Sequence, residues 1–232
     1  MIYIGSTQRI ICTTANTVLQ YNQPHSGAAW VRPFTLGTGA AGRILGKETG
    51  TGNGFRFIFS AVTGLQLNMN GAVMFALRSS DNTVSLGVWQ HLAYTYDGTA
   101  LSIGAHIYVN GVETPYNAPT EGLTPTSNLG QTISIGGRGD DTRSMDGFIT
   151  EVAVWSTTLS VQEIQILASS RVRGTPYQVR PDMLQGYWPL DDFSEGIAAA
   201  GSNSIIDRSG KGLNGTPDAG PLALAEQIIS YA

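Results

Sequence analysis

The chain has 232 residues, a formal net charge of −4 and only 13% charged residues, while 29 positions are glycine. Its 13 Lys and Arg residues form no cluster, which argues against a nucleic-acid partner. No basic amphipathic helix and no apolar stretch of about 18 residues is present, so we expect no membrane partner either.

The first half of the chain predicts a succession of short β-strands. We expect strands at residues 28–34, 55–59, 65–69 and 72–77, where apolar residues alternate with polar ones or form short runs. Asn70-Gly71 joins the last two, and Asn-Gly is the dipeptide that a tight type I′ hairpin prefers. Turn signals at such regular spacing are typical of an antiparallel sandwich or jelly roll.

Residues 88–111 carry the clearest pattern. Apolar and polar residues alternate over residues 91–96, which predicts one strand, and residues 106–109 form a second β-rich run. Asp97-Gly98 lies between them as a turn dipeptide, and Asn110-Gly111 follows as a hairpin signal. This segment therefore predicts antiparallel strands followed by a tight hairpin.

The second half predicts further strands around a long polar loop at residues 113–131. The strands are expected at residues 132–135, 148–155 and 184–190. No segment of linker composition divides the chain, so we predict one domain.

One helix is predicted, at residues 159–170. Ser160 is followed three residues later by Glu163, the spacing of a capping box. The apolar stripe that this helix would bury consists of Val161, Ile164, Leu167 and Ala168. We expect a short helix lying on a sheet edge.

The order and spacing of these segments resemble the laminin-G-type, pentraxin-like domains of the concanavalin A-like group. The matching pieces are AWVRP at 29–33, WQHLA at 89–93, IYVNG at 107–111, ISIGG at 133–137 and GFITEVAVW at 147–155. The resemblance covers about residues 26–170. It implies an all-β fold, namely an antiparallel β-sandwich jelly roll of the concanavalin A-like type with one short helix.

The C-terminal segments carry a further resemblance. YWPLD at 187–191 and DRSGKGLNG at 207–215 are similar to the strand and turn that open many such domains, although here they come last. The roughly fifty residues that remain could not form a sandwich alone. We therefore expect residues 184–232 to close the same sandwich, so that residues 1–232 form a single domain.

The same resemblance implies a calcium site as the ligand hypothesis. Some relatives bind Ca²⁺ in loops at the sandwich edge, and Asp140, Asp141 and Asp146 with loop carbonyls would supply the oxygen ligands that this hard cation needs. Aspartate is also a common turn former, which is the alternative reading of these positions. No other cofactor is expected.

Ligand recognition is expected in the loops at residues 37–54, 113–131 and 136–147. Tyr116 and Tyr177 lie in loop-like segments and are the candidates for exposed rings that stack on a ligand. The four tryptophans lie in strand-like runs and are expected to fill the core instead: Trp30, Trp89, Trp155 and Trp188.

The sequence predicts no catalytic residues. Glucanases of this fold, by resemblance, use acids that alternate along one strand, because a retaining mechanism needs two carboxyl groups about 5 Å apart. Here Glu151 stands alone, with Ile149 and Ala153 two residues away on either side. We therefore predict that the chain is not an enzyme.

The predicted function is that of a non-enzymatic structural protein on a virion surface. The chain resembles standalone domains of bacteriophage and environmental sequences, and its first residues predict no signal peptide, so we expect synthesis in a host cytoplasm. The specific prediction is a bacteriophage capsid decoration, cement or fibre-type protein. Its partners would be a major capsid or other virion protein and glycans of the host surface, within a homo-oligomer or a larger assembly.

Two alternatives stand beside this prediction. The first is a carbohydrate-binding, lectin-like module, with or without calcium. The second is a glucanase-type glycoside hydrolase, which the missing catalytic acids disfavour.

Overall fold

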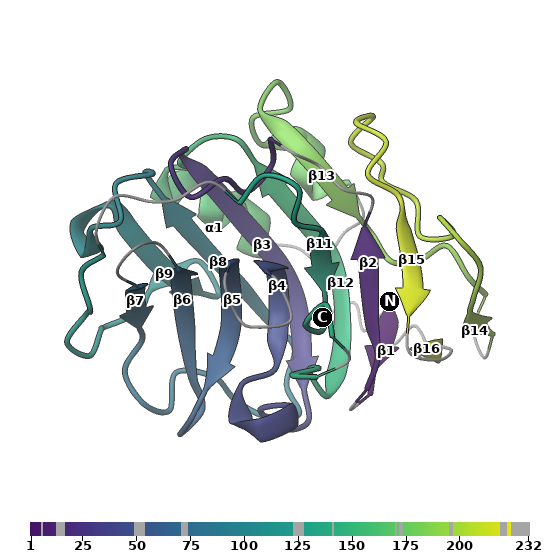
Figure 1. Ribbon diagram of the computed structural model, residues 1–232, viewed down its shortest axis with the longest axis horizontal. Coiled ribbons are helices and arrows are strands. Elements are labelled where there is room, and N and C mark those ends of the chain that lie inside the picture. Colours follow the sequence, from purple (N-terminus) through teal and green to yellow (C-terminus); the bar gives the residue numbers. More distant parts are fainter. Residues whose placement is uncertain are drawn as a thin grey trace.

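The computed structural model shows two antiparallel β-sheets that face each other across a common core (Figure 1). It describes residues 1–5, 7–12, 17–48, 54–70, 74–122, 128–140, 142–169, 171, 174–194, 197–218 and 222–223. The predicted antiparallel β-sandwich with one short α-helix is confirmed over these residues.

Sheet A has the strand order β1-β12-β3-β8-β9-β10, and β13 also pairs with β12. Its strands are β1 (Ile2–Ile4), β3 (His25–Pro33), β8 (Gln90–Tyr96), β9 (Ala105–Val109), β10 (Val112–Glu113), β12 (Gly147–Trp155) and β13 (Leu184–Trp188). Asn110 and Gly111, which join β9 to β10, both have positive φ angles (52° and 79°), as the predicted hairpin requires.

Sheet B has the order β15-β2-β11-β4-β5-β6-β7. Its strands are β2 (Arg9–Cys12), β4 (Arg43–Glu48), β5 (Gly54–Ser60), β6 (Gly64–Asn70), β7 (Met74–Arg78), β11 (Ile133–Ile135) and β15 (Gly215–Asp218). A small separate pair is formed by β14 (Ala198–Ala199) and β16 (Leu222–Ala223). Short 3-10 turns lie at Thr38–Ala40, Ser102–Gly104 and Thr175–Gln178, of which the last is η3.

The core comes from residues that alternate along each strand. Tyr94 and Tyr96 of β8 point inward, as their period of two predicts, and Phe55 and Phe57 of β5 meet them from sheet B. The centroid of the Tyr94 ring lies 5.1 Å from that of Phe55 and 5.2 Å from that of Phe57. These rings pack the two sheets together and leave the intervening residues of each strand for the outer faces.

The helix α1 (Val161–Ser169) covers part of the outer face of sheet A and does not lie on a sheet edge as predicted. Three alanines in register across the sheet, Ala28, Ala93 and Ala153, leave room for Ile164 and Leu167 of the helix. Their small side chains therefore decide where the helix can pack. No helix in the described part of the chain is long and apolar enough to cross a bilayer.

The predicted capping box at the start of α1 is confirmed. Ser160 Oγ accepts a 3.3 Å hydrogen bond from the Glu163 backbone N–H, and the Ser160 N–H donates to Glu163 Oε2 at 2.7 Å. Val161 belongs to the predicted apolar stripe but is 40% exposed, because it lies on the solvent side of the first turn.

The first strand, β1, and two strands near the C-terminal end, β13 and β15, pair with strands of the sandwich (Figure 1). β1 and β13 lie along the same side of β12, one against each half, while β15 pairs with β2 at the edge of sheet B. The Asp207 carboxylate accepts 2.9 Å hydrogen bonds from the backbone N–H groups of Tyr187, Ser209 and Leu213. This explains why an aspartate opens the DRSGKGLNG segment, which forms a turn between β13 and β15.

The prediction that all four tryptophans fill the core is wrong for two of them. Trp155 and Trp188 are buried, and each indole N–H donates a 2.8 Å hydrogen bond to a backbone carbonyl, that of Val179 and that of Leu213. Trp30 and Trp89 are half-buried on the outer face of sheet A. The Trp30 side chain points to the outer face of β3, between Ala29 and Val31, which point to the core. The alternation of side chains along a strand does not by itself tell which of the two sets faces the core.

Candidate functional site

A groove of about 380 Å³ opens on the outer face of sheet B. Ile10 and Cys12 of β2 belong to the core, so Arg9 and Ile11 between them face outward into this groove. The residues that line it are Arg9, Ile11, Glu48, Gly130, Gln131, Thr132, Gly139 and Asp218. Each of the three loops expected to carry recognition contributes at least one of these residues.

Ile11 supplies the apolar side chain in the lining of the groove. Ile11 of β2 pairs with Ser134 of β11, and Ser134 pairs with Gly46 of β4. Ser134 and Gly46 are themselves buried, so Ile11 is the member of this row that reaches the groove. This gives the groove one apolar patch between polar walls.

One wall of the groove is a chain of charged groups. Arg9 forms an ion pair with Asp218, and its Nη1 donates a 3.1 Å hydrogen bond to the Arg138 carbonyl oxygen. The Arg138 guanidinium holds both oxygens of Asp140, at 2.8 Å each. The wall is therefore fixed before any ligand arrives.

The lining also contains a buried carboxylate, Glu48, with two arginine partners. Glu48 accepts hydrogen bonds from Arg43 Nε at 2.5 Å and Arg43 Nη2 at 3.2 Å, and Arg56 Nη1 lies 3.4 Å from Glu48 Oε2. A carboxylate removed from water needs such partners to remain charged. Because the Glu48 side chain is fully buried, Asp218 is the more exposed of the two carboxylates that line the groove.

Gln131 adds a neutral amide to the groove. Its Oε1 is buried and has no hydrogen-bond partner among the described residues. An amide carries both donors and acceptors, so this side chain can turn to match a ligand.

Two of the predicted calcium ligands, Asp140 and Asp146, each have a hydrogen-bond partner within the fold. Asp140 lies beside the groove, and its pKa is held well below the usual range, chiefly by hydrogen bonds from Arg138. Asp146 instead accepts a 2.9 Å hydrogen bond from the Tyr3 hydroxyl on sheet A, and Asp141 lies outside the described residues. No group of three or more His, Cys, Asp or Glu side chains suited to a metal occurs in the described ranges. Since Asp141 is not among the residues searched, the calcium site stays a prediction.

The predicted stacking tyrosines lie away from the groove. Tyr116 is half-buried against the main core, and its hydroxyl accepts a hydrogen bond from the Ile107 N–H and donates one to Glu113 Oε1. Tyr177 is 45% exposed, meets Tyr187 edge to face at 5.1 Å and donates its hydroxyl proton to the Arg208 carbonyl. Both hydroxyls are therefore used within the fold.

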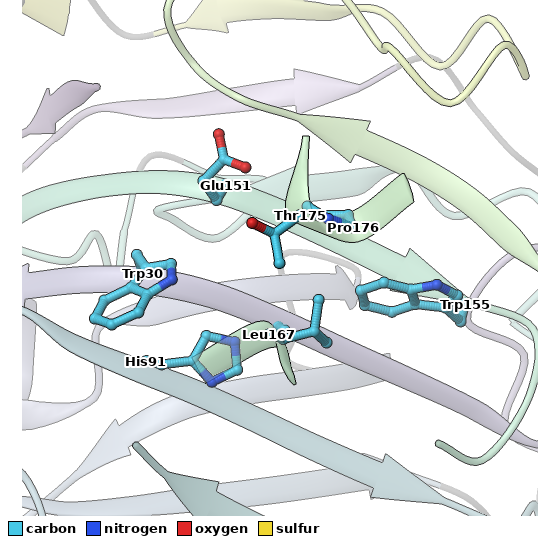
Figure 2. Close-up of a pocket in the computed structure, with 8 residues that line it drawn as sticks. Trp30, His91, Glu151, Trp155, Leu167, Thr175 and Pro176 are labelled. Atoms are coloured by element: carbon cyan, nitrogen blue, oxygen red, sulfur yellow. The ribbon is translucent and has the colours of Figure 1, made fainter. Parts of the chain in front are cut away.

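A second hollow lies beneath α1 and η3, but it is small. Figure 2 shows Trp30, His91, Glu151 and Thr175 around it, from β3, β8, β12 and η3. Its volume is about 10 Å³, room for one water molecule. His91 Nδ1 has no partner among the described atoms, and Glu151 Oε2 accepts a 2.7 Å hydrogen bond from the Tyr187 hydroxyl. This cavity is too small for a ligand of sugar size.

Sequence reasoning missed most of the groove residues. Arg9 is the first residue of β2 and Glu48 is the last residue of β4. A charged residue at the end of a strand is normally expected to face solvent, so neither position suggests a binding site. Asp218 enters the groove only because β15 pairs with β2, about 200 residues earlier in the chain, and no local pattern encodes that pairing. The local pattern of the sequence indicates only that Arg9 and Ile11 face away from the core, because they alternate with the apolar Ile10 and Cys12.

Comparisons with known proteins agree with this architecture. The Laminin_G_3 family model, described as the concanavalin A-like lectin/glucanases superfamily, matches residues 5–165. C-reactive protein 1.1 of Limulus polyphemus is 27% identical over 108 residues, which are 44% of this chain and 43% of that protein. The chain thus matches less than half the length of that relative.

Two solved structures share the fold. A candidate carbohydrate binding protein from Bacteroides ovatus has a TM-score of 0.60 at 21% identity, over 97% of this chain and 62% of that one. The CBM40 of the Ruminococcus gnavus IT-sialidase, bound to α2,3 sialyllactose, has a TM-score of 0.51 at 13% identity, over 71% and 99%. The family model covers well over half of the residues and the strands form the expected two-sheet sandwich, so this chain belongs to the concanavalin A-like lectin/glucanases superfamily.

Proposed function

We propose that the chain is a non-enzymatic carbohydrate-binding module and that the saccharide lies in the groove on sheet B. The observation that carries this proposal is the groove itself, where charged groups are held in place by ion pairs beside the apolar side chain of Ile11. Sites for small polar ligands combine such a concave shape with a few fixed polar groups.

The chemistry of the groove matches that of a sugar. Each sugar hydroxyl both donates and accepts a hydrogen bond, so it needs neighbours of both kinds. Asp218, whose side chain is 46% exposed, would accept from hydroxyls, and the Gln131 amide would do either. The Ile11 side chain would contact the C–H face of the sugar ring. Hydrogen bonds to ionised groups are the stronger ones, which favours the carboxylate as an anchor.

The same contacts support a binding role and not a hydrolytic one. The two carboxylates that line the groove, Glu48 and Asp218, are each in an ion pair with arginine. A glycosidase needs one carboxyl group that can deliver a proton to the leaving oxygen. An ion-paired carboxylate accepts hydrogen bonds well and donates protons poorly, so we propose that no sugar bond is cleaved.

The names of structural relatives support this class of ligand. One is described as a candidate carbohydrate binding protein, and the other was solved with α2,3 sialyllactose. For this chain they support carbohydrate binding as a class.

A glycan array tests the proposal. The full chain is applied with Ca²⁺ and with EDTA, beside the variant Gln131→Ala and the control Gln162→Ala on the exposed side of α1. We expect binding of at least one glycan in both buffers, weakened several-fold by Gln131→Ala and unchanged by the control. Binding of no glycan, or equal binding by Gln131→Ala, would overturn it. Binding that EDTA abolishes would instead support the predicted calcium site.

The predicted place of action is a second proposal. A glycan-binding module on a virion surface would hold host glycans, and the resemblance to standalone phage domains is what supports this location. Co-purification with intact phage particles tests it, and absence from such particles would contradict it.

A further inference from the structure

The outer face of sheet A has a half that α1 and η3 do not cover. Across it, Tyr3 of β1 pairs in register with Phe148 of β12, and Phe148 pairs with Arg32 of β3. Trp89, directly before β8, continues this row beyond Arg32, since its neighbour Gln90 pairs with Val31. Trp30 lies at the border with the half that α1 and η3 cover. We call the surface, with Trp30 included, the aromatic face; it consists of Tyr3, Trp30, Phe34, Trp89, Phe148 and Arg171.

Four of the five rings of the aromatic face contact one another and remain open to solvent, and Trp30 instead contacts His91. The Phe148 centroid lies 5.3 Å from that of Phe34, 5.6 Å from that of Tyr3 and 6.4 Å from that of Trp89. Phe34 is 40% exposed, and the other rings are half-buried. Mutual packing holds the rings still, so the surface is a rigid platform rather than a set of separate side chains.

Arg171 lies over two of these rings. Its guanidinium carbon is 4.9 Å from the Trp89 ring centre and 5.7 Å from the Trp30 ring centre. No other described residue forms a hydrogen bond or an ion pair with its side chain. Partial burial lowers the pKa of this guanidinium.

A second cation lies on the same half of the sheet. Arg32 Nε donates a 2.8 Å hydrogen bond to the Gly87 carbonyl oxygen, and its guanidinium carbon is 5.6 Å from the Phe34 ring centre. The carboxylate of Asp146 already accepts a hydrogen bond from the Tyr3 hydroxyl group. In a chain of net charge −4, this face therefore presents two guanidinium groups without a carboxylate partner among the described residues.

We infer that the aromatic face is a second ligand site, and that its ligand is an anionic saccharide. A carboxylate or sulfate group would take the forked donors of Arg171, which is preorganised by stacking on Trp89 and Trp30. The sugar ring would lie against the exposed aromatic rings beside it. This site is on the opposite sheet from the groove and shares with the proposed function only the class of ligand.

The inference is tested by titration of the full chain with three probes. A heparin-derived oligosaccharide supplies sulfate, an oligogalacturonide supplies carboxylate, and a malto-oligosaccharide is neutral. The variants are Arg171→Gln and Trp89→Ala, with Lys211→Gln as a matched control that removes one positive charge from an exposed turn. Arg171→Gln breaks no hydrogen bond of the described structure, so its fold should be intact, as a thermal melt will verify.

We expect at least one anionic probe to bind, with an affinity that Arg171→Gln and Trp89→Ala each lower at least about tenfold. Lys211→Gln should leave the affinity unchanged, added salt should weaken binding, and the sulfate and carboxylate arms identify the anionic group.

The inference is wrong if neither anionic probe binds, or if Arg171→Gln binds as well as the native chain. It is also wrong if binding is lost in Gln131→Ala but kept in Arg171→Gln, since that result assigns the anionic sugar to the groove. A native dimer that Trp89→Ala dissociates would make the face a protein interface and would likewise overturn the inference. Conversely, if the Gln131→Ala variant still binds the anionic saccharide, the aromatic face is supported as a binding site even if the groove binds no glycan.

Discussion

Arg9 on β2 forms an ion pair with Asp218 on β15, which joins the two ends of the described chain at one edge of sheet B (Figure 1). The Arg9 side chain is 7% exposed and that of Asp218 is 46% exposed. The buried Arg9 side chain is thus held by the Asp218 carboxylate and by the Arg138 carbonyl oxygen. The Asp218 carboxylate is also accessible to solvent and lines the groove.

The variant Asp218→Asn separates the contribution of this ion pair to stability from the contribution of the Asp218 carboxylate to glycan binding. The pair is partly exposed, and Arg9 keeps its bond to the Arg138 carbonyl, so we expect the free energy of unfolding to fall by about 1 kcal/mol or less. Affinity for the groove glycan should fall at least about tenfold, because a charged acceptor is lost. Urea denaturation and calorimetric titration measure the two effects.

Asp81→Asn is the matched control for this prediction. It removes a similar half-exposed carboxylate from the Arg78–Asp81 pair, at the β7 end of the sandwich. Equal loss of glycan affinity in both variants would show that the effect does not arise in the groove.

Glu48→Ala should destabilise the fold far more than these exposed changes. It leaves Arg43 and Arg56 without the carboxylate that both contact, and removing one partner of a buried ion pair costs about 3–5 kcal/mol. Glu113→Ala, which removes an exposed partner of His106, should cost about 1 kcal/mol or less. Chemical denaturation of both variants checks this, and equal costs would contradict the role given to the Glu48 cluster.

Two buried histidines should make stability depend on acid pH. Burial, with a smaller effect of the Lys47 charge, lowers the pKa of His25 from 6.5 to about 3, and burial alone lowers that of His91 to about 3. Below pH 6.5 the unfolded chain binds protons that the folded chain does not. The free energy of unfolding should therefore fall as pH drops from 6.5 toward 3, by up to about 1.4 kcal/mol per pH unit for each histidine.

His91→Phe isolates one of these contributions. His91 Nδ1 has no partner among the described atoms, so the replacement breaks no described side-chain hydrogen bond. The slope of unfolding free energy against pH should be smaller in this variant than in the native chain. Identical slopes from urea denaturation at several pH values would refute the assignment.

Trp188→Ala tests how much the C-terminal segment contributes to the core. Trp188 is fully buried in the main core and donates to the Leu213 carbonyl, so truncation should cost about 3–5 kcal/mol. Trp89→Ala, at a half-buried surface position, should cost clearly less. A similar cost for both would mean that residues 184–188 are not part of the sandwich core.

The sequence predicts the local features of this molecule well and its long-range pairings poorly. The period-two strand at β8, the Asn110-Gly111 hairpin and the Ser160–Glu163 capping box are set by neighbouring residues, and all three are confirmed. Which face of β3 holds Trp30 depends on what α1 covers, and a run of strand-forming residues does not encode it.

The candidate site shows the same division. Its three loops were expected from their glycine and polar residues, yet their meeting in one groove depends on sheet order. Asp218 reaches Arg9 only through the pairing of β15 with β2, and Asp140 is engaged by Arg138 two residues before it. Composition predicts neither contact, because an aspartate in a loop is equally suited to a turn, a cation or an ion pair.

The most direct test of glycan binding in the groove is calorimetric titration of the array-selected glycan into three proteins. These are the native chain, the double variant Gln131→Ala/Asp218→Asn and the control Gln162→Ala. The native chain and the control should bind with the same dissociation constant, and the double variant should bind at least about thirtyfold more weakly, which combines the two single effects. Undiminished binding by a folded double variant, or no binding by the native chain, would contradict the assignment of the groove as a carbohydrate site.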